Sequence, residues 1–394
     1  ADFGGGATHF TFQGDVFATD ASADPALASA GDSGHNLLAR VTHRPDADSA
    51  FQVQAYYDWF EREFLLSRDA LATFDVEAQY NRTAGAHELV FGAGVRTTRD
   101  EFTNNLNIFQ LVPQSRRLWV LNAFVQDRIT LSPELALILG LKAERTSFTG
   151  VELLPNLRLA WQPDERTLVW GAVSRAVRTP SRIDRQLQAL PFLAPGNDFD
   201  SEKLIAFEAG YRGQPFSHTT LSVSVFFNLY DDIRTTEFTG NPFPIQLRNG
   251  LEGHSYGIEA WSSTQLTPWW RLSLGLATLW KHFELEPGII DLAVRDSLGH
   301  DPDWQLLARS HVMLADGLEL NVGLRWVGDL ESPAGPGIGD YAEADARLAW
   351  RVTDSVELFV AGRNLLHRTH AESDDVQRGQ LARRSVYAGT RLRF

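Results

Sequence analysis

Hydrophobic and polar residues alternate position by position through most of this chain. In the segment 318–326, apolar side chains occupy every second position, and charged residues, asparagine and glycine lie between them. Similar alternation recurs at 221–228, 271–276, 342–352 and 386–394. Successive side chains of a β-strand point to opposite faces, so this period of two predicts strands with one apolar face and one polar face.

The predicted strands are long, and their connections alternate between short turns and longer loops. Most strands extend over roughly 10 to 20 residues, whereas strands of soluble sheets typically have about five or six. Short turns at one end and long loops at the other are typical of a transmembrane antiparallel β-barrel of an outer membrane. A soluble β-sandwich would also alternate. However, a sandwich does not explain why charged residues and glycine occupy the polar face of strand after strand. A water-filled lumen explains this pattern.

These connections predict an all-β chain of about 18 antiparallel strands in a single domain that covers residues 1–394. An even number of strands places both termini on the periplasmic side, where the short turns lie. The short turns are expected near 45–48, 84–86, 132–134, 163–165, 213–215, 266–268, 316–317 and 353–355. The longer, extracellular loops are expected near 20–34, 64–70, 99–115, 176–200, 231–243, 285–302, 330–340 and 369–382, with one tight corner near Gly150. The strands are expected at 7–19, 35–44, 50–63, 70–83, 86–98, 116–128, 135–148, 153–162, 166–175, 201–212, 217–230, 244–265, 270–284, 303–314, 318–329, 341–352, 356–368 and 383–394.

Aromatic residues lie beside the predicted short turns, where an interfacial girdle is expected. Aromatic rings prefer the boundary between lipid and water, because one edge of the ring is apolar and the other is wet. The residues in question are Trp161, Phe216, Trp269, Trp270, Trp350 and Phe394.

The composition narrows the possible functions. The formal net charge is −14, which disfavours nucleic-acid binding because that function usually needs a basic patch. The chain has no cysteine, so disulfides, thiolate metal sites and cysteine nucleophiles are excluded. Its longest apolar runs span only a few residues, whereas a transmembrane helix needs about 20. The first residues lack the basic and apolar regions of a signal peptide, so we expect a mature or truncated N-terminus.

Five segments, in this order and spacing, resemble the barrel of the TonB-dependent receptors. They are AVSRAVRTPS at 172–181, FEAGYR at 207–212 with NLYDDI at 228–233, NG at 249–250 with YGIE at 256–259, GRNLL at 362–366 and SVYAGTRLRF at 385–394. The resemblance covers roughly residues 35–394. Phe394 at the end of an alternating strand also resembles the signal that the barrel assembly machinery recognises.

The chain departs from this family in two respects. The family carries an N-terminal plug domain inside the barrel, preceded by a short segment that contacts TonB, and no segment here has that character. The family barrel has about 22 strands, against the 18 predicted here. The difference fits a chain that begins at the fifth barrel strand, and the alternative is a natural plugless pore.

The resemblance implies import of a scarce, bulky nutrient such as a ferric siderophore, cobalamin or a glycan. Its implied partners are the nutrient, the TonB complex acting through the plug, and the lipids and lipopolysaccharide of a Gram-negative outer membrane. A passive diffusion pore is the alternative, because a barrel of 16 to 18 strands without a plug encloses an aqueous channel. A barrel-borne hydrolase is a third hypothesis. No catalytic constellation stands out in the sequence, so we expect neither enzyme activity nor a cofactor.

Two sets of residues are candidates for contacts with a ligand or a plug. In the loop 176–200, Leu190, Phe192 and Leu193 could line a ligand surface or cover the mouth of the barrel. A charged wall is expected to face the lumen, where it would bind a plug, set the ion selectivity of an open pore, or simply be hydrated. Its members are Arg325, Arg347, Arg351, Arg391, Arg393, Glu319, Glu343 and Asp345.

Two loops contain residues of the kinds that bind metals. His367 and His370 are followed by Glu372, Asp374 and Asp375. The segment 296–303 contains His300 and Asp301, but its spacing matches no EF-hand. Solvated acidic loops explain both segments, so the sequence predicts no metal site.

Overall fold

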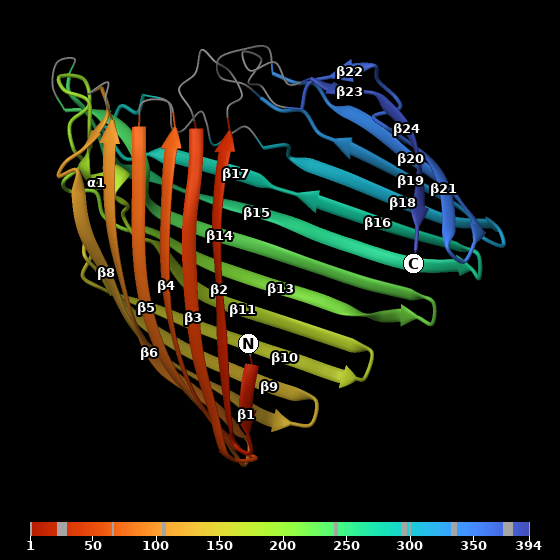
Figure 1. The fold of residues 1–394 in the computed structure, drawn as a ribbon, viewed down its shortest axis with the longest axis horizontal. Helices are drawn as coiled ribbons and strands as arrows, with labels where there is room; N and C mark the ends of the chain where they lie inside the picture. Colours follow the sequence, from red (N-terminus) through yellow and green to blue (C-terminus); the bar gives the residue numbers. More distant parts are fainter. Residues whose placement is uncertain are drawn as a thin grey trace.

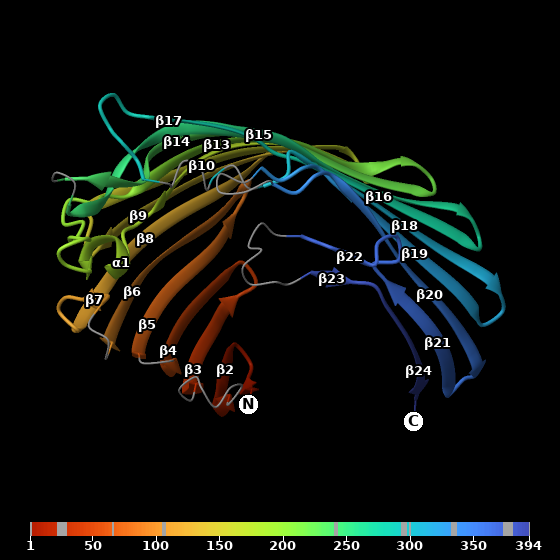
Figure 2. The same ribbon diagram turned by 90° about the horizontal axis from the view of Figure 1, so that it is seen from above.

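The computed structural model describes residues 2–21, 30–64, 67–104, 108–239, 243–292, 298, 301–331, 337–372 and 381–393. Its main feature is one antiparallel sheet of 20 strands, which curves around into an open wall (Figures 1 and 2). Neighbours along the chain pair with each other almost throughout, as in a simple up-and-down meander. No helix in the described part of the chain is long and apolar enough to cross a membrane.

The elements of the chain have the following bounds. The strands of the large sheet are β1 (Asp2–Gly5), β2 (Thr8–Ala21), β3 (Ala30–Asp46), β4 (Ser49–Phe64), β5 (Ser67–Ala84), β6 (His87–Asn104), β8 (Ser115–Ser132), β9 (Leu135–Thr146), β10 (Val151–Asp164), β11 (Thr167–Arg178), β13 (Glu202–Phe216), β14 (Thr219–Phe238), β15 (Ile245–Thr267), β16 (Trp270–Thr278), β17 (Trp280–Leu285), β18 (Trp304–Ala315), β19 (Leu318–Val327), β20 (Tyr341–Thr353), β21 (Val356–Arg363) and β24 (Ser385–Leu392). The remaining elements are β7 (Gln110–Leu111), α1 (Arg182–Gln186), β12 (Leu187–Gln188), β22 (Thr369–His370) and β23 (Ala382–Arg383).

All 18 predicted strands are present, and two further strands complete the 20 of the sheet. One predicted strand, 270–284, is interrupted at Leu279 into β16 and β17, which both pair with β15. The other addition is β1, which pairs antiparallel with the first residues of β2. Residues 2–5 therefore double back from the turn at 6–7 and stay near the short-turn end of the sheet.

Several strands extend further than the sequence predicts. β4 ends at Phe64 and β5 begins at Ser67, so the long loop expected at 64–70 is wrong. The polar residues that suggested a loop belong to paired strands. Cross-strand ion pairs hold them together, with 3.0 Å between Arg62 Nε and Asp32 Oδ1 and 2.5 Å between Arg68 Nη2 and Glu61 Oε2. Strands can continue in this way beyond a bilayer because water hydrates their charges on both faces.

The short turns, which define the turn end of the sheet, have two residues between the strands. Side chains close several of them locally. Asp46 Oδ1 accepts from the Asp48 amide at 2.9 Å, and Asp164 Oδ1 accepts from the Arg166 amide at 2.7 Å. The turn expected at 213–215 lies instead at 217–218, because β13 continues through an irregularity in register between Gly213 and Phe216. Proline has no amide to donate to a ladder, so Pro215 fits such a bulge.

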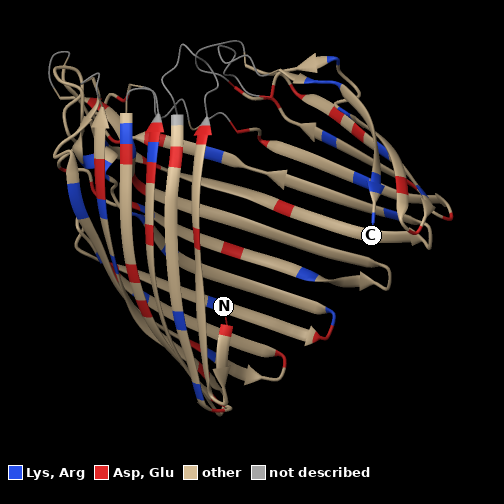
Figure 3. Cartoon of the chain, viewed as in Figure 1, with Lys and Arg blue, Asp and Glu red and all other residues tan. Residues whose placement is uncertain are grey.

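The two faces of the sheet differ in chemistry. On β10, Leu153, Leu157 and Leu159 are exposed, whereas Glu152 and Asn156 on the opposite face are half-buried. Charged residues recur along the strands, and not only in the connections (Figure 3). Few apolar side chains of the described residues are buried. A soluble protein buries its large apolar side chains, so this arrangement is stable only where the apolar face contacts lipid.

The predicted aromatic girdle residues lie at the turn end of the sheet. Trp161, Phe216, Trp269 and Trp350 are about half exposed or more, and the rings of Trp269 and Trp270 stack at 6.2 Å. Phe394 lies outside the described residues. The exposed rings extend the apolar face up to the turns, as an interface with lipid headgroups requires.

The sheet has two unpaired edges in the described part of the chain. β24 pairs only with β21, and β1 pairs only with β2. Figure 2 shows the two ends of the wall approaching each other without joining. Unpaired amide and carbonyl groups are costly in hydrocarbon, so a membrane wall needs a partner at both edges.

Candidate functional site

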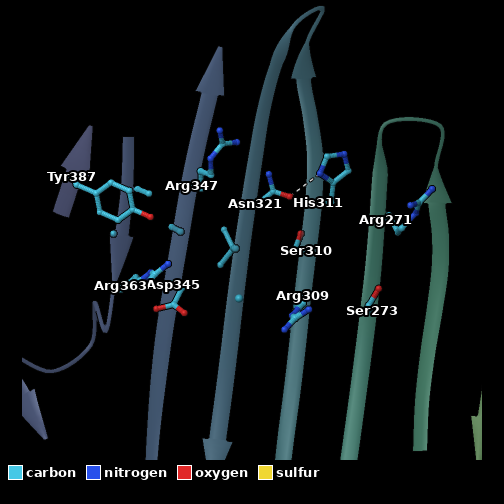
Figure 4. Close-up of a pocket in the computed structure, with 15 residues that line it drawn as sticks. Arg271, Ser273, Arg309, Ser310, His311, Asn321, Asp345, Arg347, Arg363 and Tyr387 are labelled. Carbon is cyan, nitrogen blue, oxygen red and sulfur yellow. Dashed lines mark hydrogen bonds between the residues drawn. The ribbon is translucent and has the colours of Figure 1, made fainter. Parts of the chain in front are cut away.

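The polar face of β16–β24 forms a hollow of about 470 Å³. Strand register builds one cross-strand row from Arg271, His311, Asn321, Arg347 and, beyond Ala361, Tyr387. A second row, nearer the loop end, contains Ser273, Arg309, Gly323 and Asp345. Figure 4 shows these side chains on adjacent strands, with Asn321 Oδ1 2.8 Å from His311 Nδ1.

The hollow has an excess of positive charge. Four arginines line it, Arg271, Arg309, Arg347 and Arg363, together with a single carboxylate, Asp345. Arg347 Nη2 also bonds Glu357 Oε1, at 2.6 Å, just outside the hollow. Guanidinium groups bind carboxylates and phosphates through paired hydrogen bonds, so this surface favours an anionic partner.

The structure divides the predicted charged wall into two groups. Near the hollow, Arg351 Nη2 lies 3.7 Å from Glu319 Oε1, and Arg391 Nη1 lies 3.5 Å from Glu357 Oε1. Arg393 follows the end of β24, where its amide donates to the Ser355 carbonyl at 3.0 Å. Arg325 and Glu343 lie at the loop end, in contact with the segment after β21.

The loop 176–200 contains structure that the sequence analysis missed. Ser181 and Asp184 form a capping box that starts helix α1, and Leu187 pairs with Leu111 between β12 and β7. The signal was present in the sequence as Ser181 followed three residues later by an acidic residue. At five residues, the helix is too short for its periodicity to be recognised.

Buried ion pairs anchor this loop to the barrel wall. Arg182, only 5% exposed, places Nη1 2.5 Å from Asp100 Oδ2 of β6 and donates from Nε to Gln186 Oε1 at 2.8 Å. Arg178 Nη1 bonds Asp184 Oδ2 at 2.9 Å. The loop is therefore a fixed ledge at the loop end of the strands.

The ledge around α1 should become less stable at acidic pH. Burial alone would raise the pKa of Asp184, but hydrogen bonds from Arg178 and Ser181 outweigh it and hold this pKa below its usual value of 3.8. A carboxyl with a lowered pKa in the folded state stabilises the fold above its unfolded pKa, and this contribution is lost as the pH falls through the folded value. We expect the protection of the α1 amides, measured against the intrinsic exchange rate at each pH, to fall below about pH 3.8. Asp184→Asn should exchange faster at neutral pH and lose this acid response; an unchanged acid response in that variant would contradict the assignment.

The predicted ligand residues lie on this ledge and away from the charged hollow. Leu190 and Phe192 are 65% and 57% exposed, and Leu193 is half-buried. Phe192 packs edge-on against Phe243 with ring centroids 5.1 Å apart, and its carbonyl accepts from the Ile245 amide at 2.8 Å. The structure thus brings a second loop to the predicted surface. Phe243 was missed because nothing in the sequence indicates which loops meet.

Of the residues considered for metal binding, Asp374, Asp375 and His300 lie outside the described residues. Asp301 forms an ion pair with Lys281, 2.6 Å from Oδ2 to Nζ, which fits a solvated loop. His367 and His370 instead approach Glu343, which the sequence analysis had placed in the charged wall.

Comparison with known proteins identifies the architecture. The family model described as TonB dependent receptor-like, beta-barrel matches residues 2–365. The structure of the siderophore receptor PirA from Acinetobacter baumannii is 13% identical with a TM-score of 0.68, over 98% of this chain and 76% of that chain. The FrpB iron transporter from Neisseria meningitidis is 14% identical with a TM-score of 0.77, over 100% of this chain and 70% of that chain. No curated protein sequence matches the chain.

At such low identity the solved structures establish the fold, and the family model establishes the family. They confirm the predicted all-β antiparallel barrel and the resemblance on which the sequence analysis relied. Members of this family are transporters and not enzymes, as expected from the lack of a catalytic constellation. The chain belongs to the TonB-dependent receptor-like β-barrel family, whose barrels lie in the outer membrane of Gram-negative bacteria.

Proposed function

We propose that this barrel imports a scarce, bulky nutrient of the ferric siderophore or cobalamin class, with energy supplied by the TonB complex through a plug domain. The family match over residues 2–365 carries this proposal. Its support comes also from the solved structures of like fold, which include siderophore receptors and an iron transporter.

The ligand surface in this proposal is the ledge at the extracellular end. Leu190 and Phe192 expose apolar area on a loop that buried ion pairs hold in place, and the exposed Phe243 of a second loop packs against Phe192. A rigid ledge binds with a smaller loss of conformational entropy than a mobile loop would. Fully covering one such side chain stabilises a complex by about 1.5–3 kcal/mol, so single truncations should weaken binding about tenfold or more.

The arginine-rich hollow of the lumen is proposed to bind the plug. Acidic side chains of a plug would satisfy Arg271, Arg309 and Arg363, while Arg347 is already paired with Glu357. We further propose that additional strands of the full-length protein pair with β24 and with the edge that β1 and the rest of β2 form. The support is physical, since open strand edges in hydrocarbon leave backbone groups without partners.

Uptake by cells tests the proposal. A strain lacking the gene is compared with its parent for uptake of ⁵⁵Fe-loaded catecholate and hydroxamate siderophores and of labelled cobalamin. We expect uptake of one of these probes to disappear on deletion of the gene and, equally, on deletion of TonB. If the deletion strain takes up all probes at the parental rate, the proposed class of nutrient is contradicted.

Point variants locate the ligand surface. Phe192→Ala is expected to raise the ligand concentration for half-maximal uptake about tenfold or more. Ile290→Ala is the matched control, because Ile290 is 68% exposed in a different extracellular loop. If the two variants have equal effects, the ledge does not bind the ligand.

A passive pore is the alternative function. The mass and the conductance of the protein distinguish it from a plugged transporter. The intact mass of the mature protein from native outer membranes should exceed the 44.0 kDa of this chain by at least a plug. The purified protein should then be nearly silent in a planar bilayer. A mass near that of this chain together with steady conductance would favour the pore.

A further inference from the structure

A carboxylate and two histidines meet at the extracellular end of β20, outside the arginine-rich hollow and the ledge. Glu343 is the third residue of β20 and is only 1% exposed. Three backbone amides donate to its carboxylate, those of Ala344 and Leu366 to Oε2 and that of His367 to Oε1, at 3.1–3.3 Å. This carboxylate is therefore fixed in position by the backbone.

The imidazoles of two histidines approach the same oxygen of Glu343. His367 Nδ1 lies 2.7 Å from Oε1, and His370 Nδ1 lies 3.2 Å from it. The three potential ligand atoms lie within 4.8 Å of one another. Neighbouring ligands of a tetrahedral zinc ion, each about 2.0–2.2 Å from the metal, are separated by about 3.3 Å. The cluster therefore needs only small side-chain movements to receive one ion.

One of these nitrogens has an unused lone pair or proton. The side chain of His370 is only 9% exposed, and its Nδ1 forms no hydrogen bond with any described residue despite its proximity to Glu343. A buried polar atom without a partner is costly and unusual. Its orientation toward Glu343 and His367 is that of a metal ligand.

The outer contacts also match those of a metal-binding histidine. The other nitrogen of His370, Nε2, lies 2.8 Å from Glu372 Oε1. Arg325 donates to the same carboxylate oxygen and, at 3.2 Å, to Asn364 Oδ1. A carboxylate that holds the far nitrogen of a ligating histidine fixes the tautomer and orientation of the ring.

A turn at residues 364–365, held by hydrogen bonds to β20, places the two histidines beside this strand. Asn364 adopts a left-handed backbone conformation with φ of 52°. Its amide donates to Asp345 Oδ1 at 2.9 Å, and the next amide, of Leu365, donates to the Ala344 carbonyl at 2.8 Å. The backbone thus folds back against the strand that holds Glu343, and the site is preorganised.

We propose that Glu343, His367 and His370 bind one divalent transition-metal ion of the zinc type, which fastens the segment after β21 to β20. Two imidazoles and one carboxylate suit such ions, and a fourth position remains for water. His367 is 48% exposed and provides the route of entry. The proposal is independent of the nutrient that the barrel imports.

Metal titration of the purified full-length protein tests this proposal. After chelator treatment and dialysis, the protein is titrated with Zn²⁺ by calorimetry and with Co²⁺ by visible absorption. We expect one equivalent to bind, with the intense Co²⁺ bands of a four-coordinate site. Glu343→Gln, His367→Ala and His370→Ala should each weaken binding by more than tenfold. Glu372→Gln should weaken it about 10–100-fold, as loss of an outer contact does.

His282→Ala is the matched control. His282 also contacts a carboxylate, with 2.9 Å between Nε2 and Glu284 Oε1, but among the described residues it belongs to no group of three ligand atoms within 4.8 Å of one another. Its loss should leave the titration unchanged. His367→Ala guards against misfolding as an explanation, because this half-exposed side chain can be removed without opening a buried space. No binding by the parent protein, or equal binding by all variants, would overturn the proposal.

Discussion

Replacing Arg182 by methionine should release the ledge that α1 builds at the extracellular end of the barrel. The guanidinium joins three segments, namely its own helix α1, strand β6 and residues 113–114. It donates to Gln186, to Asp100, and to the carbonyls of Pro113 and Gln114. Asp100 Oδ1 is already buried without a partner, so the variant would leave a buried carboxylate with neither oxygen paired to an arginine. Removing one member of a buried ion pair costs about 3–5 kcal/mol.

Hydrogen exchange measures this loss locally. The amide of Val112 donates to the Gln186 carbonyl at 3.1 Å and reports whether the two loops remain together. A loss of about 3–5 kcal/mol in the free energy of opening the loop should accelerate exchange of this amide by roughly 10²–10³-fold or more in Arg182→Met. The exposed pair of Arg62 and Asp32 provides the control, because Arg62→Met should cost less than about 1 kcal/mol.

A double variant separates the ion pair from general damage. In Asp100→Asn combined with Arg182→Met, no uncompensated charge remains buried. The combined cost should therefore be well below the sum of the two single costs. Additive costs would mean that Arg182 acts through packing alone, and that the ledge does not depend on the pair.

The strands of this chain could be predicted from sequence because their pattern is local. A lipid-facing strand exposes every second residue to hydrocarbon, so the alternation at 318–326 survives without any knowledge of its neighbours. The same pattern predicts the ends of the strands less well. The charged residues Arg62 and Arg68 suggest a loop, yet they lie in strands that continue into water.

The candidate sites could be predicted only in part, because they depend on contacts between distant segments. Leu190 and Phe192 stood out as apolar residues in a long loop, but their neighbour Phe243 lies about 50 residues away in the chain. Glu343 alternates with apolar residues and was therefore assigned to the charged wall. Its actual partners, His367 and His370, come from a turn whose direction depends on the left-handed Asn364.

The same alternation predicts which substitutions the membrane will not tolerate. Leu141 of β9 is 44% exposed on the apolar face, between Val125 and Pro155 of the neighbouring strands. It lies six residues from Leu135 at the turn end. At about 3.3 Å per residue and a tilt near 40°, this is roughly 15 Å into the wall, close to the middle of an apolar band about 25 Å tall.

Leu141→Arg is expected to destabilise the barrel by about 2–4 kcal/mol, because a guanidinium near the middle of the bilayer must be hydrated through a distorted membrane. Reversible unfolding of the full-length protein in lipid vesicles by guanidinium chloride would measure this cost. Gln126→Arg is the matched control, since Gln126 pairs with Gly140 one position away and faces the polar side of the sheet. We expect it to cost less than about 1 kcal/mol, as a charge in a hydrated lumen does. If the two arginines cost the same, the apolar face does not contact lipid at this depth. The orientation of the whole wall would then be wrong, because strand register fixes every other side chain relative to Leu141.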